Sequence, residues 1–127
     1  DGHHLAFTRV QEIFASIAPR VLLVSDAMAA AGNGDGKYTI GALPVEVSNG
    51  VARLASNQKL AGSTLTISQA FVNLINHCGV SLPQAVHATS VQPAKAFGLK
   101  DRGSIAAGMR ADLLSYNSAT NSVTVIS

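Results

Sequence analysis

Asp26 has the sequence position most typical of a catalytic acid or base. It directly follows Arg20-Val-Leu-Leu-Val-Ser25, a short and mainly apolar run. Such a run is typical of a strand buried on both faces of a parallel sheet, and α/β enzymes carry their chemistry just beyond the carboxyl ends of these strands. Position alone also fits a helix N-cap, because aspartate caps helices well. Asp26 is therefore the candidate catalytic residue, with a structural cap as the alternative.

Four histidines are the other candidates for proton transfer or metal binding. His3 and His4 are adjacent, and successive side chains of an extended backbone point to opposite faces, so only one of them is expected in a given pocket. His77 is expected in the last turn of a helix, where a cation complements the helix dipole, and His87 within a helix, so both are interpreted as structural. A metal site needs three or four converging ligands, and Asp26 with one amino-terminal histidine supplies two at most. These residues alone therefore predict no complete metal site.

The segment Gly62-Ser-Thr64 stands directly before a predicted helix. Backbone N–H groups at a helix N-terminus attract anions, so the segment could contact a phosphate. No lysine follows it as in a P-loop. A turn with a helix cap is the simpler interpretation of the same residues.

The elements that must position these residues begin with an amphipathic helix. Between Leu5 and Ala18, apolar residues recur at three- and four-residue spacing, which predicts a helix that Pro19 ends; they are Phe7, Val10, Phe14 and Ile17. A helix followed by the predicted buried strand Val21–Ser25 is half of a β/α repeat.

The pattern changes after Asp26. Residues 29–36 are a glycine-rich loop, and two alternating segments follow at 37–43 and 45–48. Asn49-Gly50 predicts a tight hairpin that returns through residues 51–54. This β unit does not continue the β/α alternation, so we expect it to form a separate sheet.

Capping boxes at residues 66–69 and 81–84 predict two further helices. The expected buried stripe of the first helix is Ile67, Phe71, Leu74, Ile75 and Cys78, with Gly79 at its carboxyl end. The segment 91–93 contains Pro93 and is expected to interrupt the second helix. Strands are predicted at 111–116 and 123–126.

Composition excludes several classes of function. Hydrophobic residues make up 47% of the 127 residues and charged residues 13%, about half the usual share of roughly 25%. The nine basic residues form no cluster that would indicate a nucleic-acid partner. The single cysteine, Cys78, cannot form an internal disulfide, and no apolar run approaches the ~18 residues of a membrane span. Because the chain begins abruptly at Asp1, we expect it to be part of a longer polypeptide.

Three segments together resemble one enzyme family. Asp1-Gly-His-His-Leu5, Leu23-Val-Ser-Asp-Ala-Met-Ala-Ala-Ala-Gly32 and Leu60-Ala-Gly-Ser-Thr-Leu-Thr66 are similar, in this order, to the carboxyl-terminal third of N-acetylglucosamine-6-phosphate deacetylase. The resemblance continues through the segments 73–82 and 88–94. The tail Gly103-Ser-Ile-Ala-Ala-Gly-Met-Arg-Ala-Asp-Leu113 is similar to a stretch common across the amidohydrolase superfamily.

The resemblance implies an α/β fold: the carboxyl-terminal fragment of a (β/α)8 TIM-like amidohydrolase barrel plus strands of a small β-sandwich. Residues 1–36 would form the last barrel helix, strand eight and the active-site loop. Residues 37–55 would be a sandwich hairpin, 56–110 helices that pack on the barrel, and 111–127 the closing sandwich strands.

The resemblance also assigns roles. Asp26 matches the catalytic aspartate, which accepts a proton from the attacking water and returns a proton to the departing amine. His4 matches a histidine that contacts the sugar-phosphate substrate. The implied substrate-binding residues are Asp1, Gly2, His3, His4, Leu60, Ala61 and Gly62.

The implied reaction hydrolyses N-acetylglucosamine 6-phosphate to glucosamine 6-phosphate and acetate. It would use a divalent metal, zinc or iron, whose ligands (a glutamate and two histidines) lie outside this chain. The substrate would be a phosphorylated amino sugar in the cytoplasm, without a nucleic-acid or membrane partner, and the intact enzyme would be a homodimer. We expect these 127 residues alone to be inactive.

Two alternatives remain open from the sequence. One is another amidohydrolase, such as an adenine or dihydropyrimidine-type hydrolase, which shares the tail and the strand-eight aspartate. The other is a non-catalytic α/β binding module, in which Asp26 is a plain cap and the glycine-rich loop is a binding surface.

Overall fold

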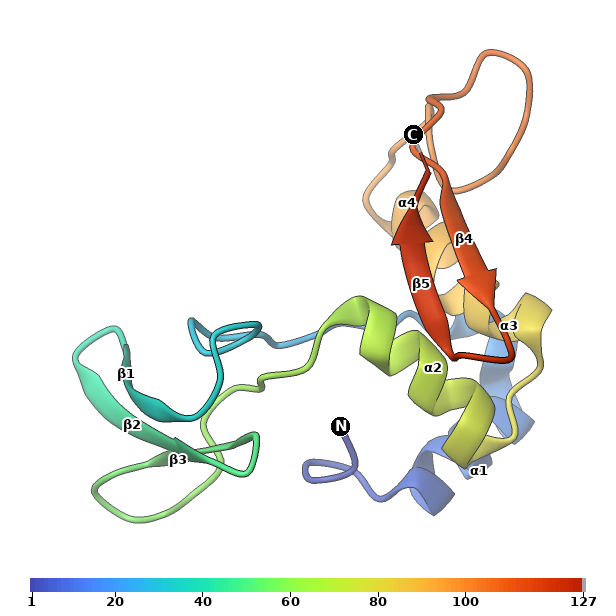
Figure 1. The fold of residues 1–127 in the computed structure, drawn as a ribbon. Coiled ribbons are helices and arrows are strands. Elements are labelled where there is room, and N and C mark those ends of the chain that lie inside the picture. Colours follow the sequence, from blue (N-terminus) through green and yellow to red (C-terminus); the bar gives the residue numbers. More distant parts are fainter. Residues whose placement is uncertain (127) are drawn as a thin grey trace. The chain divides into compact units, whose positions relative to one another are not determined.

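A computed structural model describes residues 1–126 of the chain. Its elements, in order, are α1 (Phe7–Ile17), the 3-10 turn η1 (Ala18–Arg20), β1 (Gly36–Ile40), β2 (Leu43–Ser48), β3 (Val51–Leu54), α2 (Ile67–Cys78), α3 (Leu82–Val86), the π-helix η2 (His87–Val91), α4 (Gln92–Ala96), β4 (Leu114–Asn117) and β5 (Ser122–Val125) (Figure 1). The chain divides into two compact units. The first comprises Asp1–Ala6 and Val24–Ala70, and the second comprises Phe7–Leu23 and the chain from Phe71 onward.

The first unit is built on an antiparallel sheet in the order β1-β2-β3. Val45 and Val47 of β2 point to the same face and are buried, while the residues between and beside them are exposed, as the period of two requires. The rest of this core is Ala30, Ala52 and Ala61, with Met28, Tyr38 and Leu54 packed against it. The predicted separate sheet is therefore confirmed.

The hairpin between β2 and β3 turns at Asn49-Gly50, as predicted. Both residues have positive φ (51° and 72°), which a two-residue type I′ turn requires. Asp35 fastens this turn, because its carboxylate accepts hydrogen bonds from the backbone N–H groups of Asn49 (2.6 Å) and Gly50 (2.9 Å).

The second unit packs helices and a two-stranded hairpin around one apolar core. Its buried residues are Phe14, Phe71, Val72, Leu74, Cys78, Val80, Ala85 and Ala88. The hairpin β4-β5 covers this core through Tyr116 and Val123, and the Tyr116 ring meets Phe71 edge-on at 5.0 Å. Both predicted helices and both predicted strands of this region are confirmed, with shifted ends. Two residues expected in the buried stripes, Ile17 and Ile67, are instead exposed at the ends of their helices.

The predicted interruption at residues 91–93 is wrong. The helix continues, and it widens into the π-turn η2 before α4. The Gln92 N–H donates to the carbonyl of His87, five residues back. Pro93 has no N–H and its ring would crowd the carbonyl four residues before it, so a wider turn accommodates the proline without ending the helix.

The predicted buried strand Val21–Ser25 is also not formed. The segment is extended, but the two sheets of the described residues contain no strand that pairs with it, and Val24 is 68% exposed. Its Leu23 N–H donates instead to the carbonyl of Ala88 in η2 (3.0 Å). A parallel strand is defined by its neighbours, and residues 1–126 provide none for this segment.

Candidate active site

Asp26 lies at the end of this extended segment, in a left-handed backbone conformation (φ 49°). Its carbonyl accepts a hydrogen bond from the Ser63 N–H (2.8 Å), and the Ser63 carbonyl accepts one from the Met28 N–H (2.9 Å). These two bonds form an isolated parallel bridge between Ala27 and Ser63. Positive φ is uncommon outside glycine, although aspartate tolerates it better than most residues. The backbone on both sides therefore fixes Asp26, while Asp26 itself remains exposed to solvent.

The alternative that Asp26 is a helix cap is wrong. No helix begins between Asp26 and the start of β1; the residues after Asp26 form turns. The Ala31 N–H donates to the Met28 carbonyl and the Asn33 N–H to the Ala30 carbonyl, both at 2.9 Å. The predicted glycine-rich loop is thus present.

Gly62 brings a second chain segment against Asp26. It has φ +64°, and a Cβ built on it would lie 3.3 Å from Met28 Cβ and 3.4 Å from the Asp26 carbonyl oxygen. Glycine is required here both by the backbone conformation and by the close approach. The predicted catalytic residue and the predicted segment Leu60–Gly62 are therefore neighbours.

Leu60 and Ala61 attach this second segment to the sheet. Leu60 forms an isolated antiparallel bridge with Arg53, and the Ala61 N–H donates to the carbonyl of Ala52 (3.1 Å). The Ala61 side chain is buried in the core of the first unit. Any contact that Ala61 makes with a ligand must therefore come from its backbone.

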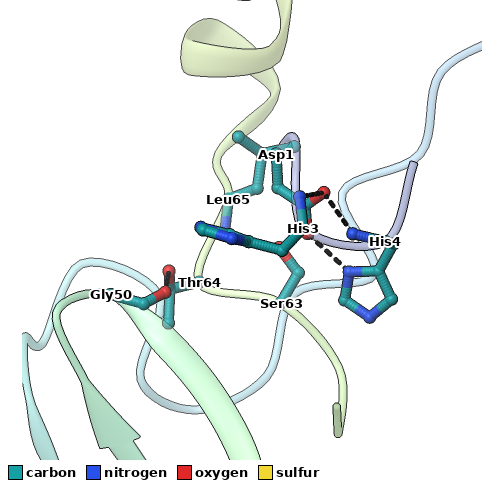
Figure 2. A network of polar contacts seen from close by, with 7 residues as sticks. All are labelled: Asp1, His3, His4, Gly50, Ser63, Thr64 and Leu65. Carbon is teal, nitrogen blue, oxygen red and sulfur yellow. Dashed lines mark hydrogen bonds and ion pairs between the residues drawn. The ribbon is translucent and has the colours of Figure 1, made fainter. Parts of the chain in front are cut away.

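The segment Asp1–His4 forms a tight turn (Figure 2). Gly2 has φ 82°, and Asp1 Oδ1 accepts hydrogen bonds from the backbone N–H groups of His3 (3.0 Å) and His4 (3.1 Å). The reasoning that these histidines must point to opposite faces assumed an extended backbone, and it does not apply to this turn.

The same carboxylate binds the imidazole of His4. Asp1 Oδ2 lies 2.5 Å from His4 Nδ1, and the Asp1 side chain is 17% exposed while that of His4 is 39% exposed. Figure 2 shows the second ring nitrogen of His4 on the side of the ring away from Asp1. The turn belongs to the same compact unit as Asp26 and Gly62.

The remaining candidates have local structural roles. His77 lies in the last turn of α2, as predicted, and its ring stacks on Phe7 (4.8 Å between centroids). Ser63 Oγ accepts a hydrogen bond from the Leu65 N–H (2.7 Å), and Thr64 Oγ1 donates to the carbonyl of Gly50 (2.6 Å). These hydroxyls serve a turn, and Thr66 Oγ1 caps α2 by accepting from the Gln69 N–H, as the simpler interpretation predicts.

The described residues contain no group of three or more His, Cys, Asp or Glu side chains that could hold a metal ion. The side chains present therefore do not fit a complete metal centre. No helix of residues 1–126 is long and apolar enough to cross a membrane.

Comparison with known proteins identifies the family. Residues 63–125 match the Amidohydrolase family. The structure of N-acetyl-D-glucosamine-6-phosphate deacetylase from Mycobacterium smegmatis superimposes with a TM-score of 0.90 and 40% sequence identity, and it covers 98% of this chain. The N-acetylglucosamine-6-phosphate deacetylase from Thermotoga maritima superimposes with a TM-score of 0.88 and 40% sequence identity, and it covers 99% of this chain. A candidate N-acetylgalactosamine-6-phosphate deacetylase of Escherichia coli K12 is 37% identical over 119 residues, which are 93% of this chain and 71% of that protein. The chain belongs to the N-acetylglucosamine-6-phosphate deacetylase family of amidohydrolases.

Membership in this deacetylase family confirms the expected fold class, the carboxyl-terminal α/β part of a TIM-like barrel with β-sandwich strands. The chain spans 34% and 35% of the two superimposed structures. It likewise spans 30% of the Vibrio furnissii N-acetylglucosamine-6-phosphate deacetylase, to which it is 34% identical. The predicted division at residues 36, 55 and 110 stays a prediction.

Sequence reasoning missed the pairing of Asp1 with His4. The signal was present as an aspartate three residues before a histidine with glycine between them. The Asp1 carboxylate can reach His4, three residues later in the chain, only when the backbone turns, and Gly2 permits that turn.

Proposed function

We propose that this chain forms the carboxyl-terminal part of an enzyme that hydrolyses the acetamide of N-acetylglucosamine 6-phosphate, releasing glucosamine 6-phosphate and acetate. The observation that carries the proposal is the backbone bridge that holds Asp26 against Gly62 and Ser63, in the unit that also contains the Asp1–His4 turn. The family supports the substrate class, because the Mycobacterium smegmatis deacetylase was solved in complex with N-acetyl-D-glucosamine-6-phosphate.

Asp26 is proposed as the general base and then the general acid. Its carboxylate accepts the proton of the water that attacks the acetamide carbonyl, and the resulting carboxylic acid protonates the departing amine nitrogen. One carboxylate can serve both steps because the proton gained in the first is lost in the second. The Mycobacterium smegmatis substrate complex was obtained with an aspartate-to-alanine mutant, which supports a need for an aspartate in turnover.

The substrate-binding roles follow from backbone and side-chain access. His4 is proposed to contact the substrate through its exposed imidazole, in the segment that also contains Gly2 and His3. Gly62, with Leu60 and Ala61, is proposed to contact it through backbone groups, because Gly62 has no side chain and the Ala61 side chain is buried in the core.

Amidohydrolases are typically metal-dependent. A bound divalent metal would polarise the acetamide carbonyl and activate water. We propose zinc or iron, with ligands from a part of the enzyme other than these 127 residues, because the described residues hold no three-ligand group. A polypeptide limited to this chain is accordingly expected to release no acetate. The intact enzyme is proposed to be a cytoplasmic homodimer.

The galactosamine epimer is a second candidate substrate. The Escherichia coli K12 relative and the Escherichia coli O157:H7 N-acetylgalactosamine-6-phosphate deacetylase are each 37% identical to this chain over 119 residues. The two sugars differ only in the configuration of one hydroxyl.

The test is acetate release by the full encoded enzyme with four substrates: the 6-phosphates of N-acetylglucosamine and N-acetylgalactosamine, and both sugars without phosphate. The proposal predicts the highest kcat/KM for N-acetylglucosamine 6-phosphate. Preference for the galactosamine epimer would favour the second candidate. Equal turnover of the unphosphorylated sugars, or turnover of none of the four, would overturn the proposed substrate class.

A further inference from the structure

We infer that Asp1 is a positioning residue that holds the proton of His4 on Nδ1, so that Nε2 is the nitrogen presented to the substrate. This inference deepens the proposed function, since it rests on His4 contacting the substrate. It changes the role expected for Asp1, which acts through His4 rather than by touching the ligand.

The hydrogen bond between Asp1 and His4 has a fixed direction. A carboxylate has no proton to donate, so the short contact between Asp1 Oδ2 and His4 Nδ1 (2.5 Å) requires that Nδ1 carries the hydrogen. In a neutral imidazole this leaves the lone pair on Nε2. If the ring gains a second proton, that proton also enters at Nε2.

The Asp1 carboxylate is itself immobilised. Asp1 Oδ1 accepts from two backbone N–H groups, those of His3 (3.0 Å) and His4 (3.1 Å), while Oδ2 binds the ring. Both oxygens are thus committed in fixed directions. Partners of this kind determine which tautomer and which ring orientation a functional histidine adopts.

The two side chains differ in their exposure to solvent. Asp1 is 17% exposed and His4 is 39% exposed, so the carboxylate forms the covered base of the pair and the imidazole its accessible part. Nε2 lies on the side of the ring away from Asp1 (Figure 2).

The variant Asp1→Asn tests this with almost no change in shape. The amide oxygen replaces Oδ1, because two N–H donors point there, and the amide NH2 then faces His4 Nδ1. That nitrogen must now accept, so the ring proton moves to Nε2. We expect ¹⁵N NMR of the full enzyme to show a protonated Nδ1 at His4 in the wild type and a protonated Nε2 in Asp1→Asn. A protonated Nε2 with bare Nδ1 in the wild type would overturn the inference, even if Asp1→Asn does not fold.

Kinetics provide the second readout. Asp1→Asn is expected to lower kcat/KM about 10–100-fold, mainly through KM, as loss of a histidine-orienting partner does. In a His4→Gln background the same substitution should have no further effect, because Asp1 acts only through His4. Equal effects of Asp1→Asn in both backgrounds would overturn the inference.

The matched control is Asp112→Asn. Asp112 also binds a basic side chain, accepting from Arg110 Nε at 2.7 Å, but it lies in the other unit and is exposed. Its substitution should leave kcat/KM and the His4 spectrum unchanged. If the enzyme hydrolyses none of the four substrates, the proposed function fails, whereas the NMR measurement still decides the tautomer.

Discussion

At the scale of single residues, glycine and aspartate do the most to define the candidate site. Asp26 and Gly62 both have positive φ, and each lies against the backbone of the other's segment. Strained or unusual backbone conformations persist only where surrounding contacts fix them, and they concentrate at functional sites. Asp26 could be proposed from its position after an apolar run, and Gly62 from the family resemblance. Their contact could not be predicted, because it joins segments more than thirty residues apart.

Replacing Gly62 with alanine should lower both stability and activity. A left-handed backbone costs an alanine about 1–2 kcal/mol, and the contacts with Met28 and the Asp26 carbonyl add overpacking of about 1–3 kcal/mol. Urea unfolding of the full enzyme measures the first effect, and acetate release of the folded fraction measures the second.

Gly108→Ala separates backbone strain from crowding. Gly108 also has positive φ (+84°), but nothing lies within 4 Å of its built Cβ. Gly108→Ala should lower the free energy of unfolding only by the cost of the left-handed backbone, and it should keep full activity. Equal losses of stability and activity in both variants would show that Gly62 is not constrained by its contact with Asp26.

At the scale of elements, the helices and hairpins were predictable because their signals are local. Capping boxes, the Asn49-Gly50 turn and the apolar stripe of α2 each lie within a few residues of the structure that they determine. Two features of the fold were not predictable from the sequence. Val21–Ser25 carries the composition of a buried parallel strand, yet strand pairing depends on neighbours distant in the chain. The π-turn before α4 arises because Pro93 changes the hydrogen bonding of the helix without ending it.

Phe71 should be essential for the stability of the second unit. It is buried in that unit's core, where its ring meets Tyr116, so Phe71→Ala is expected to lower the free energy of unfolding by about 3–5 kcal/mol. Phe97 is the matched control, because it is 74% exposed and its removal should change stability by less than about 0.5 kcal/mol. Urea denaturation followed by circular dichroism compares the two, and similar losses would contradict the assigned core.

Cys78 should be unreactive in the folded protein. Burial in the core raises the pKa of its thiol above the ordinary value of 9.0, so less thiolate is present at any pH below that value. Alkylation by iodoacetamide at pH 8 should be much slower in the native enzyme than in urea. Because the pKa of the thiol is higher in the folded state than in the unfolded state, its protonated form stabilises the folded state below pH 9.0. This stabilisation is lost as the pH rises through the raised pKa. Equal native and denatured alkylation rates would contradict its burial.

At the scale of the whole molecule, the described residues carry a candidate site and leave apolar surface exposed. Leu114 of β4 and Val125 of β5 pair across the hairpin and are 62% and 72% exposed, and Ile105 is 89% exposed. This is consistent with a chain that spans about a third of the deacetylase structures it matches. The family and fold class were predictable from ordered motifs. The atoms that surround Asp26 in the complete barrel were not, because no signal in 127 residues determines side chains outside them.

The turnover number of Asp26→Asn in the full encoded enzyme shows directly whether this carboxylate transfers the proton. Asparagine preserves the size of the side chain but cannot accept and return a proton. Acetate release from N-acetylglucosamine 6-phosphate should therefore fall about 10²–10⁴-fold in kcat. Calorimetric binding of the same substrate should remain near that of the wild type. An unchanged kcat in the folded variant would contradict the central claim that Asp26 transfers the proton.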